Sequence, residues 1–388
     1  MIEIDKQRTW AQIHYDRIAH NVKEVQKLIG NTKIMGIVKA NAYGHGAVRC
    51  TQELKKAGVD YFAVACLSEA QQLRQAGIED PILILGYTAP ACFDELAQGH
   101  FVQSVVSYDY AKKLNAYGLA HNMKMSVHVK ADTGMNRTGI LYEDGQKDFE
   151  QICEVYWMKG LDVQGIFSHF PVSDDLGCDS KVFTENQIRL FNELVDRLKA
   201  QGIEPGLRHI QNSYGILNYK DLGMDYCRPG LLYMGVTSDD TIEIESNPDF
   251  IPILEWKTKV SLVKDVPDGA TISYGRHYTC HGTRRIASLA IGYADGLSRM
   301  CSNQGLNVSI RGHLVPIVGN ICMDQCMVDV TGFDDIVEGD VATLVGKDGD
   351  QICKVDEISR LAKTINNETL SAITSRVVRI DQNNELAK

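Results

Sequence analysis

The sequence predicts an α/β fold, with an N-terminal (β/α)8 TIM-like barrel over residues 1–245 and a mainly β domain over residues 246–388. Two observations predict it. In the first 240 residues, short apolar runs alternate with longer stretches of helical spacing, as in a parallel sheet closed into a barrel. After residue 245 the chain changes to β-rich segments separated by Gly, Asp and Asn turns. The stretch EIESNPDFIP is the expected boundary.

The eight predicted barrel strands are short and apolar. In chain order they are residues 34–38, 61–66, 82–86, 102–106, 125–129, 163–167, 207–211 and 231–235. Residues 13–29, before the first strand, and residues 186–200 show the spacing of amphipathic helices. An open doubly wound sheet is the alternative, but no G-x-G-x-x-G follows the first strand, which disfavours a dinucleotide-binding version.

The second domain is predicted to be built from strands with a single helix, residues 355–363. The predicted strand segments are LEWKTKVSLVKDV, RRIASLAIGY, LNVSIRG, HLVPIVG, MVDVTG and DVATLVG.

Composition excludes several classes of protein. The 388 residues carry a formal net charge of −10, which argues against nucleic acid as the main partner. We find no apolar run long enough to span a bilayer and no signal-peptide pattern at the N-terminus, so a cytoplasmic location is expected. The 11 cysteines lack zinc-ligand spacing, and the closest pair, in CMDQC, is not a C-x-x-C motif. We therefore expect free thiols and no metal site.

Polar residues follow several predicted strands, at the barrel end where active sites collect. They are Lys39 in GIVKANAYGHG, Lys130 in HVKADTGMNRTG, His169 in FSHF and Ser213 in NSYG, and Arg228 in CRPG comes just before the predicted eighth strand. This set suits an anionic ligand with a carbonyl group, because a lysine of lowered pKa can form a Schiff base with it.

Seven motifs together resemble the alanine racemase family. They are GIVKANAYGHG, HVKADTGMNRTG, NSYG, RPG, ISYGRHY, AIGYADG and GNICMDQ, in order along nearly the whole chain. The resemblance implies an isomerase that uses pyridoxal 5′-phosphate on a barrel followed by a β domain. It also implies a homodimer with two shared sites, to which each β domain contributes across the interface.

The resemblance implies two catalytic groups. Lys39 would form the Schiff base with the cofactor and move a proton on one face of the substrate Cα. Tyr274, from the β domain of the other subunit, would serve the opposite face. A phenol is a poor base near neutral pH unless its surroundings favour the phenolate.

The remaining site residues are also implied by the resemblance. Tyr43 and Ser213 would bind the cofactor phosphate, together with the backbone amides near Gly230 and Leu231. His169 and Arg228 would contact the cofactor ring. Arg137 and the backbone of Met323 would hold the substrate carboxylate. Lys130 matches a lysine that many members carry as a carbamate, which could orient Arg137.

Two positions depart from the family pattern. Asn367 stands where a tyrosine usually narrows the pocket, and Asn320 where an arginine usually lies at the entrance. An amide can donate and accept, so Asn367 would give a β-hydroxyl space and a partner. Both changes resemble the racemase domain of membrane-bound serine/alanine racemases from vancomycin-resistance clusters. We therefore predict a racemase for serine and alanine that supplies D-amino acids for peptidoglycan, in this chain without a membrane segment.

Other interpretations stay open at this point. A strict alanine racemase, an amino-acid decarboxylase of the same plan and a non-catalytic pyridoxal-phosphate carrier are the alternatives. Single residues have structural alternatives too: Lys130 could be an unmodified ion-pair lysine, Arg228 could pair with Asp225, and Tyr293 could be a packed aromatic.

Overall fold

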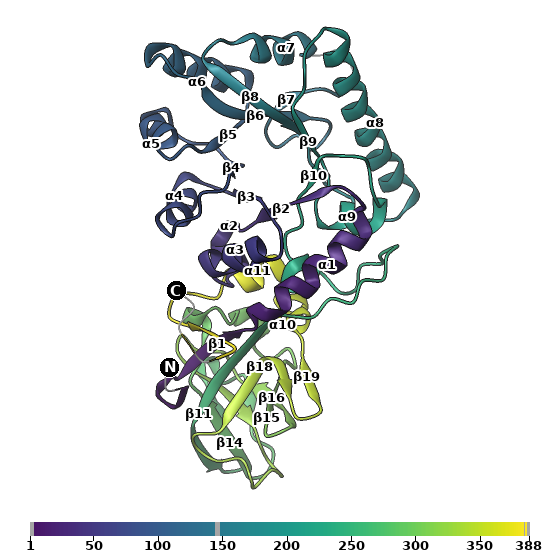
Figure 1. Cartoon of the computed structure of the whole chain (residues 1–388). Helices are drawn as coiled ribbons and strands as arrows, with labels where there is room; N and C mark the ends of the chain where they lie inside the picture. Colours follow the sequence, from purple (N-terminus) through teal and green to yellow (C-terminus); the bar gives the residue numbers. More distant parts are fainter. Residues whose placement is uncertain (1–3, 144–147, 384, 386–388) are drawn as a thin grey trace.

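The computed structural model describes residues 4–143, 148–383 and 385. Figure 1 shows the two parts of the chain, a barrel encircled by helices and a β domain beside it, with β1 and β11 running between them.

Eight parallel strands close the barrel, as the sequence predicts. In ring order they are β2 (Lys33–Ile37), β3 (Tyr61–Val64), β4 (Ile82–Ile84), β5 (Val102–Val105), β6 (Met125–Asp132), β8 (Leu161–Phe167), β9 (Leu207–His209) and β10 (Tyr226–Cys227). The ring closes where β10 pairs with β2, and a short β7 (Ile140–Leu141) is added to β6.

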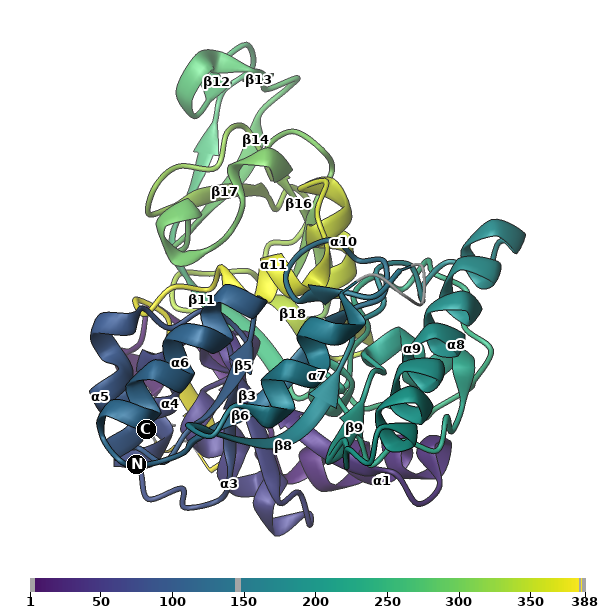
Figure 2. The ribbon, with the colours of Figure 1, turned by 90° about the horizontal axis from the view of Figure 1, so that it is seen from above.

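Helices cover the outside of the barrel (Figure 2). They are α1 (Ile18–Ile29), α3 (Ala47–Lys56), α4 (Leu67–Gln75), α5 (Phe93–Gln98), α6 (Tyr108–Ala120), α7 (Phe149–Trp157), α8 (Cys178–Ala200) and α9 (Ser213–Tyr219). The amphipathic stretch over residues 186–200 thus forms the second half of a longer helix.

The predicted eighth strand, residues 231–235, is wrong. That segment contains the 3₁₀ turn η4 (Leu232–Met234), whose three side chains are at most 1% exposed. A short apolar run buried on all sides has the same pattern in a strand and in a helix. The strand is β10, two residues long, and Arg228 directly follows it instead of preceding a strand. The correction moves Arg228 to the carboxyl end of the barrel.

The β domain contains nine strands in one sheet. Their order is β19 (Gln351–Cys353), β18 (Val341–Asp348), β15 (Asn307–Ile310), β16 (His313–Val318), β17 (Cys326–Asp329), β14 (Arg284–Leu289), β11 (Leu254–Val266), β1 (Thr9–Ile13) and β20 (Val378–Asp381). A hairpin of β12 (Thr271–Ile272) and β13 (Tyr278–Thr279) lies at its far end in Figure 2. The predicted helix is α10 (Val355–Leu361), and α11 (Asn366–Ser371) follows it.

The first strand of the chain belongs to the second sheet. β1 pairs antiparallel with β11 and parallel with β20, so residues 9–13 do not join the barrel strands. Trp10 of β1 and Trp256 of β11 are at most 2% exposed. The domain boundary near residue 245 stays a prediction, with this N-terminal strand as an addition to the β domain. Within the described ranges, no helix combines the length and the apolar character that a bilayer crossing requires.

Candidate active site

A cavity of about 420 Å³ lies at the carboxyl ends of the barrel strands. Nine of the residues predicted for the site line it: Lys39, Tyr43, Lys130, Arg137, His169, Ser213, Arg228, Gly230 and Asn367. Four of them are cations, and none of the described residues lining this cavity is an aspartate or a glutamate. An uncompensated cationic cavity favours ligands that carry phosphate or carboxylate groups.

Lys39 follows β2 and opens a left-handed turn. The four residues from Ala40 to Tyr43 have φ between 50° and 54° in an element that spans α2 (Lys39–Tyr43). A left-handed helical conformation costs roughly 1–2 kcal/mol per non-glycine residue. Such strain persists only where the surroundings hold it, and it gathers at functional sites.

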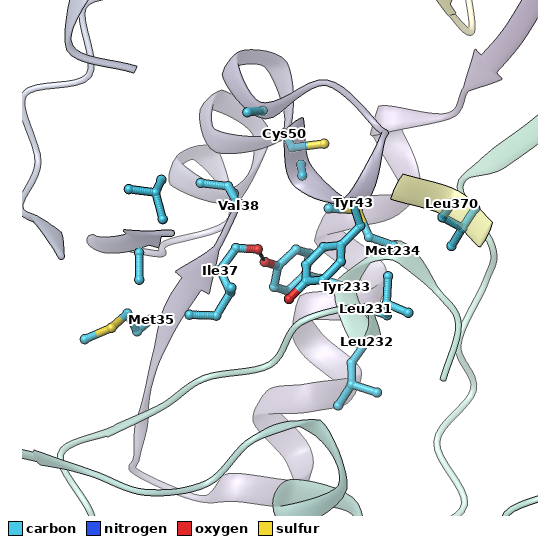
Figure 3. Packing of buried hydrophobic residues seen from close by; sticks show 14 of the residues in the cluster. Met35, Ile37, Val38, Tyr43, Cys50, Leu231, Leu232, Tyr233, Met234 and Leu370 are labelled. Carbon is cyan, nitrogen blue, oxygen red and sulfur yellow. Dashed lines mark hydrogen bonds between the residues drawn. The ribbon is translucent and has the colours of Figure 1, made fainter. Parts of the chain in front are cut away.

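Several contacts hold this turn in place. Glu69 at the start of α4 accepts hydrogen bonds from the amides of Ala40 (2.6 Å) and Ala65 (2.8 Å). Gly44, which ends the turn, lies so close to the carbonyl of Leu370 that a Cβ there would be 2.2 Å from its oxygen. Below the turn, the hydroxyl of Tyr233 donates to the carbonyl of Ile37 in the buried cluster that Figure 3 shows. The role of Glu69 could not be predicted, because an acidic residue in the first turn of a helix is common.

The Lys39 amine lies in a cationic and largely buried environment. Burial lowers its pKa, and the charges of Arg137 and Arg228 lower it further, while Glu69 acts in the opposite direction. A lysine of lowered pKa is neutral for a larger fraction of the time and is therefore a better nucleophile and base.

Arg228 is 4% exposed and is held entirely by neutral acceptors. Its guanidinium donates to the carbonyls of Ser168 (2.6 Å) and Ile210 (3.0 Å) and to His169 Nδ1 (3.1 Å). It does not pair with Asp225, whose carboxylate binds Arg208 at 2.9 Å. A buried guanidinium that no carboxylate neutralises presents its full positive charge to the cavity.

A chain of buried side chains behind Arg228 was not predicted. Arg228 Nη1 contacts His209 Nδ1 (2.5 Å), His209 Nε2 contacts His128 Nδ1 (2.9 Å), and His128 Nε2 contacts Tyr61 Oη (3.2 Å). Because a guanidinium can only donate, His209 Nδ1 must accept, and each ring then donates through Nε2. Burial lowers the pKa of His128 to about 3, so these rings are neutral near pH 7. Neutral histidines on barrel strands look like ordinary core polar residues in the sequence.

Lys130 is 4% exposed, and its Nζ donates to Thr138 Oγ1 at 2.8 Å. Burial lowers its pKa from 10.5 to about 8, with Arg137 as the next contributor. Among the described residues, none of the ion pairs involves Lys130, so the ion-pair alternative finds no support here.

The lowered pKa of Lys130 predicts a pH dependence of stability. The unfolded chain binds more protons than the folded chain between pH about 8 and 10.5, so stability should rise with pH in that window. Lys130→Met should remove this rise, on the order of 3 kcal/mol in all for a shift of this size. Urea unfolding of the ligand-free proteins from pH 7.5 to 10.5 measures the difference in free energy of unfolding between wild type and Lys130→Met. If the two free energies change with pH in parallel across this window, this account is contradicted.

Tyr43, Ser213 and Gly230 meet at one end of the cavity. The Gly230 amide donates to Ser213 Oγ at 3.0 Å, and a Cβ at Gly230 would lie 2.7 Å from Tyr43 Oη. Any side chain at position 230 would therefore fill the space between the two hydroxyls. Leu231 is 1% exposed and belongs to the core cluster of Figure 3, so its side chain does not reach the cavity.

Asn367, on α11, lines the cavity on the side of the β domain. Its Oδ1 is buried and has no hydrogen-bond partner. The preceding Asn366 is fully buried and uses its side chain to bind the Thr237 carbonyl and Asp356. One asparagine of the pair thus fixes the helix, while the other lines the cavity and has an acceptor without a partner.

Tyr274 and Met323 do not line this cavity. They lie on the β domain, where their side chains are 72% and 52% exposed. Tyr274 begins the 3₁₀ turn η5 (Tyr274–Arg276) between β12 and β13, the hairpin that Figure 2 shows farthest from the barrel. Tyr293, 40% exposed, lies in η6 (Tyr293–Asp295) of the same domain, so it is not a packed core aromatic. Within one chain, Lys39 lies in the barrel cavity and Tyr274 lies on the β domain outside that cavity.

Comparison with known proteins identifies the family. Residues 13–238 match the family model of the alanine racemase N-terminal domain, and residues 253–381 match that of the alanine racemase C-terminal domain. Alanine racemase 1 of Clostridium acetobutylicum is 36% identical over 98% of this chain and 97% of its own length. Alanine racemase of Desulforamulus reducens is 38% identical over 97% of this chain and 99% of its own.

Solved structures agree over the same length. Alanine racemase of Clostridium difficile 630 superposes with a TM-score of 0.90 at 35% identity, covering 99% of this chain and 98% of that chain. Alanine racemase of Bacillus anthracis with bound L-Ala-P gives a TM-score of 0.89 at 30% identity, with coverage of 98% and 97%. The chain belongs to the alanine racemase family, whose members are isomerases that depend on pyridoxal 5′-phosphate.

Proposed function

We propose that this protein racemises both alanine and serine, with Lys39 of one subunit and Tyr274 of another as the two proton-transfer groups. The observation that carries the proposal is the cationic cavity around Lys39, a half-buried lysine of lowered pKa among three other cations. D-Alanine and D-serine formed in this way would supply peptidoglycan precursors.

The cavity fits pyridoxal phosphate. The bare backbone of Gly230 leaves room for an anionic group between the hydroxyls of Tyr43 and Ser213, where a Cβ would block it. Lys39 offers an amine for the carbonyl carbon, and Arg228 would face the ring nitrogen. When bound, the cofactor supplies a carbonyl for the amino group and a conjugated ring that delocalises negative charge from Cα.

Arg228 would keep that ring nitrogen unprotonated, because a guanidinium does not give up its proton near neutral pH. A ring nitrogen without a proton would make the bound cofactor a weaker electron acceptor, which would favour return of a proton to Cα over transamination. Arg137 and the Met323 amide would hold the substrate carboxylate. The guanidinium of Arg137 can donate two parallel hydrogen bonds to it. A carbamate on Lys130 would place an anion beside Arg137 and orient it, and the lowered pKa of Lys130 favours the neutral amine that such a modification needs.

Racemisation requires a proton to leave one face of Cα and another to arrive on the opposite face. Lys39 would serve one face and Tyr274 the other. Tyr274 is strongly exposed and absent from the Lys39 cavity of its own chain, which supports a second copy as the partner. The same contact would bring Met323, also on the exposed part of the β domain, to the substrate carboxylate. The proposed assembly is thus a homodimer with two sites, each built from both chains.

The unpaired Asn367 Oδ1 supports serine as a substrate. A β-hydroxyl can donate to this acceptor, whereas the methyl group of alanine leaves it without a partner. An asparagine is also smaller than the tyrosine usual at this position, so the pocket has room for the additional oxygen.

Asn367→Tyr is expected to lower kcat/KM for serine by about 10–100-fold and to change kcat/KM for alanine by less than about threefold. The ratio of the two, measured as loss of optical rotation, is the readout. Asn366, which is buried and saturated with hydrogen bonds, is unsuitable as a control, so Asn383→Ala outside the cavity serves instead. An unchanged ratio would contradict the role proposed for Asn367, and absence of serine turnover by the wild-type protein would leave a strict alanine racemase.

One assay of the purified protein tests the function as a whole. We expect a visible absorption band from lysine-bound cofactor and loss of optical rotation with L-alanine and L-serine. A band without loss of rotation would indicate a carrier of the cofactor, and release of carbon dioxide would indicate a decarboxylase.

A further inference from the structure

Asn320 lies next to the segment that carries Tyr274, and the whole of its side chain is used there. It is 8% exposed, although the family pattern places this position at the entrance of the site. Its Nδ2 donates to the backbone carbonyl of Tyr274 at 2.7 Å, and its Oδ1 accepts from Asn303 Nδ2 at 3.1 Å. Because both polar atoms of this buried side chain are hydrogen-bonded, the side chain is held in one position.

The Tyr274 segment needs such support, because its backbone is unusual. Ser273 and Arg276 have φ values of 67° and 54°, and Gly275 between them has 76°. Positive φ at non-glycine residues is held by surrounding contacts. In the described structure, Asn320 makes two of these contacts. Its side-chain amide donates to the Tyr274 carbonyl, and its backbone carbonyl accepts from Ser273 Oγ at 2.6 Å.

The same stretch of chain leads to Met323. The Met323 carbonyl accepts from the Ala294 amide at 3.0 Å, and the Cys322 carbonyl accepts from the Tyr293 amide at 3.0 Å. Gly292 lies against this turn so closely that a Cβ there would be 2.4 Å from the Met323 carbonyl oxygen. Residues 319–325 are therefore fixed on one side to residues 292–294 and on the other side to residues 273–275.

We propose that Asn320 is a positioning residue that sets the phenol of Tyr274 relative to the carboxylate-binding backbone of Met323. This inference rests on the proposed role of Tyr274. An arginine, the usual family residue here, is longer and always charged, and could not replace an amide that both donates to Tyr274 and accepts from Asn303. In this chain the neutral side chain of Asn320 would thus connect the Tyr274 segment to the Met323 segment, the two parts of the β domain proposed to enter a partner's site.

The test uses the holoenzyme with Asn320→Leu, which is similar in size and makes no hydrogen bonds, and with Asn320→Asp. Misplacement of a proton-transfer group by about 1 Å can cost 10²-fold in rate, so we expect kcat for alanine to fall by about 10–100-fold. KM should change by less than about threefold. The cofactor absorption band should not change, because Asn320 is not among the residues that line the Lys39 cavity of its own chain. Asn307→Ala, on β15 of the same domain, is the matched control and should stay within about twofold.

The readout specific to positioning is the α-deuterium isotope effect for each enantiomer. If the Tyr274 step is slowed alone, the isotope effect rises for the enantiomer whose α-proton Tyr274 removes and falls for the other. Asn320→Asp should lose activity when its carboxylate is ionised, because the ionised group cannot donate to the Tyr274 carbonyl. As the pH falls and the carboxyl group is protonated, the activity of this variant relative to wild type should rise. A general structural defect would change both isotope effects in parallel.

Tyr274→Phe is measured beside these variants. If it keeps full activity, the proposed role of Tyr274 fails, and the positioning role fails with it. If it loses activity while Asn320→Leu is normal or shifts both isotope effects equally, only the positioning role is overturned. If Asn320→Leu does not fold, the pH-dependent recovery of Asn320→Asp decides, and its absence overturns the proposal.

Discussion

Replacing Lys39 with alanine is expected to lower racemisation by on the order of 10⁴-fold or more. The change removes both the amine that would bind the cofactor and a proton-transfer group, and acid–base catalysis alone contributes about 10²–10⁴-fold. The visible absorption band of lysine-bound cofactor should disappear. The fold should persist, because the Lys39 amine makes no hydrogen bond within the described residues that the substitution could break. Optical rotation and the absorption spectrum provide the two measurements.

The matched control for Lys39 is Lys33, at the opposite end of the same strand β2. Its side chain pairs with Asp60 at 2.9 Å and is 60% exposed. An exposed ion pair is worth little, so Lys33→Ala should stay within about twofold of the wild-type rate. Retention of substantial racemisation by Lys39→Ala would contradict the assignment.

Replacing Tyr274 with phenylalanine is expected to lower kcat by about 10²–10⁴-fold with little change in cofactor absorption or in unfolding temperature. Tyr274 is 72% exposed in the single chain, so loss of its hydroxyl removes no contact from the fold. Tyr278→Phe is the control within the same hairpin. It removes the hydrogen bond from Tyr278 Oη to Asp329 at 3.1 Å and should cost stability rather than rate. Unimpaired turnover by Tyr274→Phe would exclude the phenol as a proton-transfer group.

Much of the barrel site could be predicted from the sequence, because the carboxyl ends of parallel strands converge on one face. Lys39, His169 and Arg228 follow barrel strands, Lys130 lies near the carboxyl end of β6, and all four line one cavity. Arg228 lines the cavity even though the eighth strand was misplaced, since the family motif locates the residue independently of the strand.

The features that were missed depend on tertiary contacts. The left-handed turn after Lys39 contains alanines, whose conformational preference gives no sign of it, and it is held by Glu69 from another helix. The buried pair His128 and His209 comes from β6 and β9, which are far apart in the sequence and both pair with β8, and the sheet brings His128 Nδ1 within 2.9 Å of His209 Nε2. β1 was missed because its partners, β11 and β20, follow more than 200 residues later.

The central claim is that each active site combines Lys39 of one subunit with Tyr274 of the other, and a heterodimer tests it most directly. Lys39→Ala and Tyr274→Phe chains carrying different tags are coexpressed, and the mixed dimer is isolated through both tags. In a shared-site dimer, one site receives both substitutions and the other receives neither, so about half of the wild-type activity per dimer is predicted. A mixed dimer as inactive as its two parents would show that each site is completed within one chain and would contradict the account.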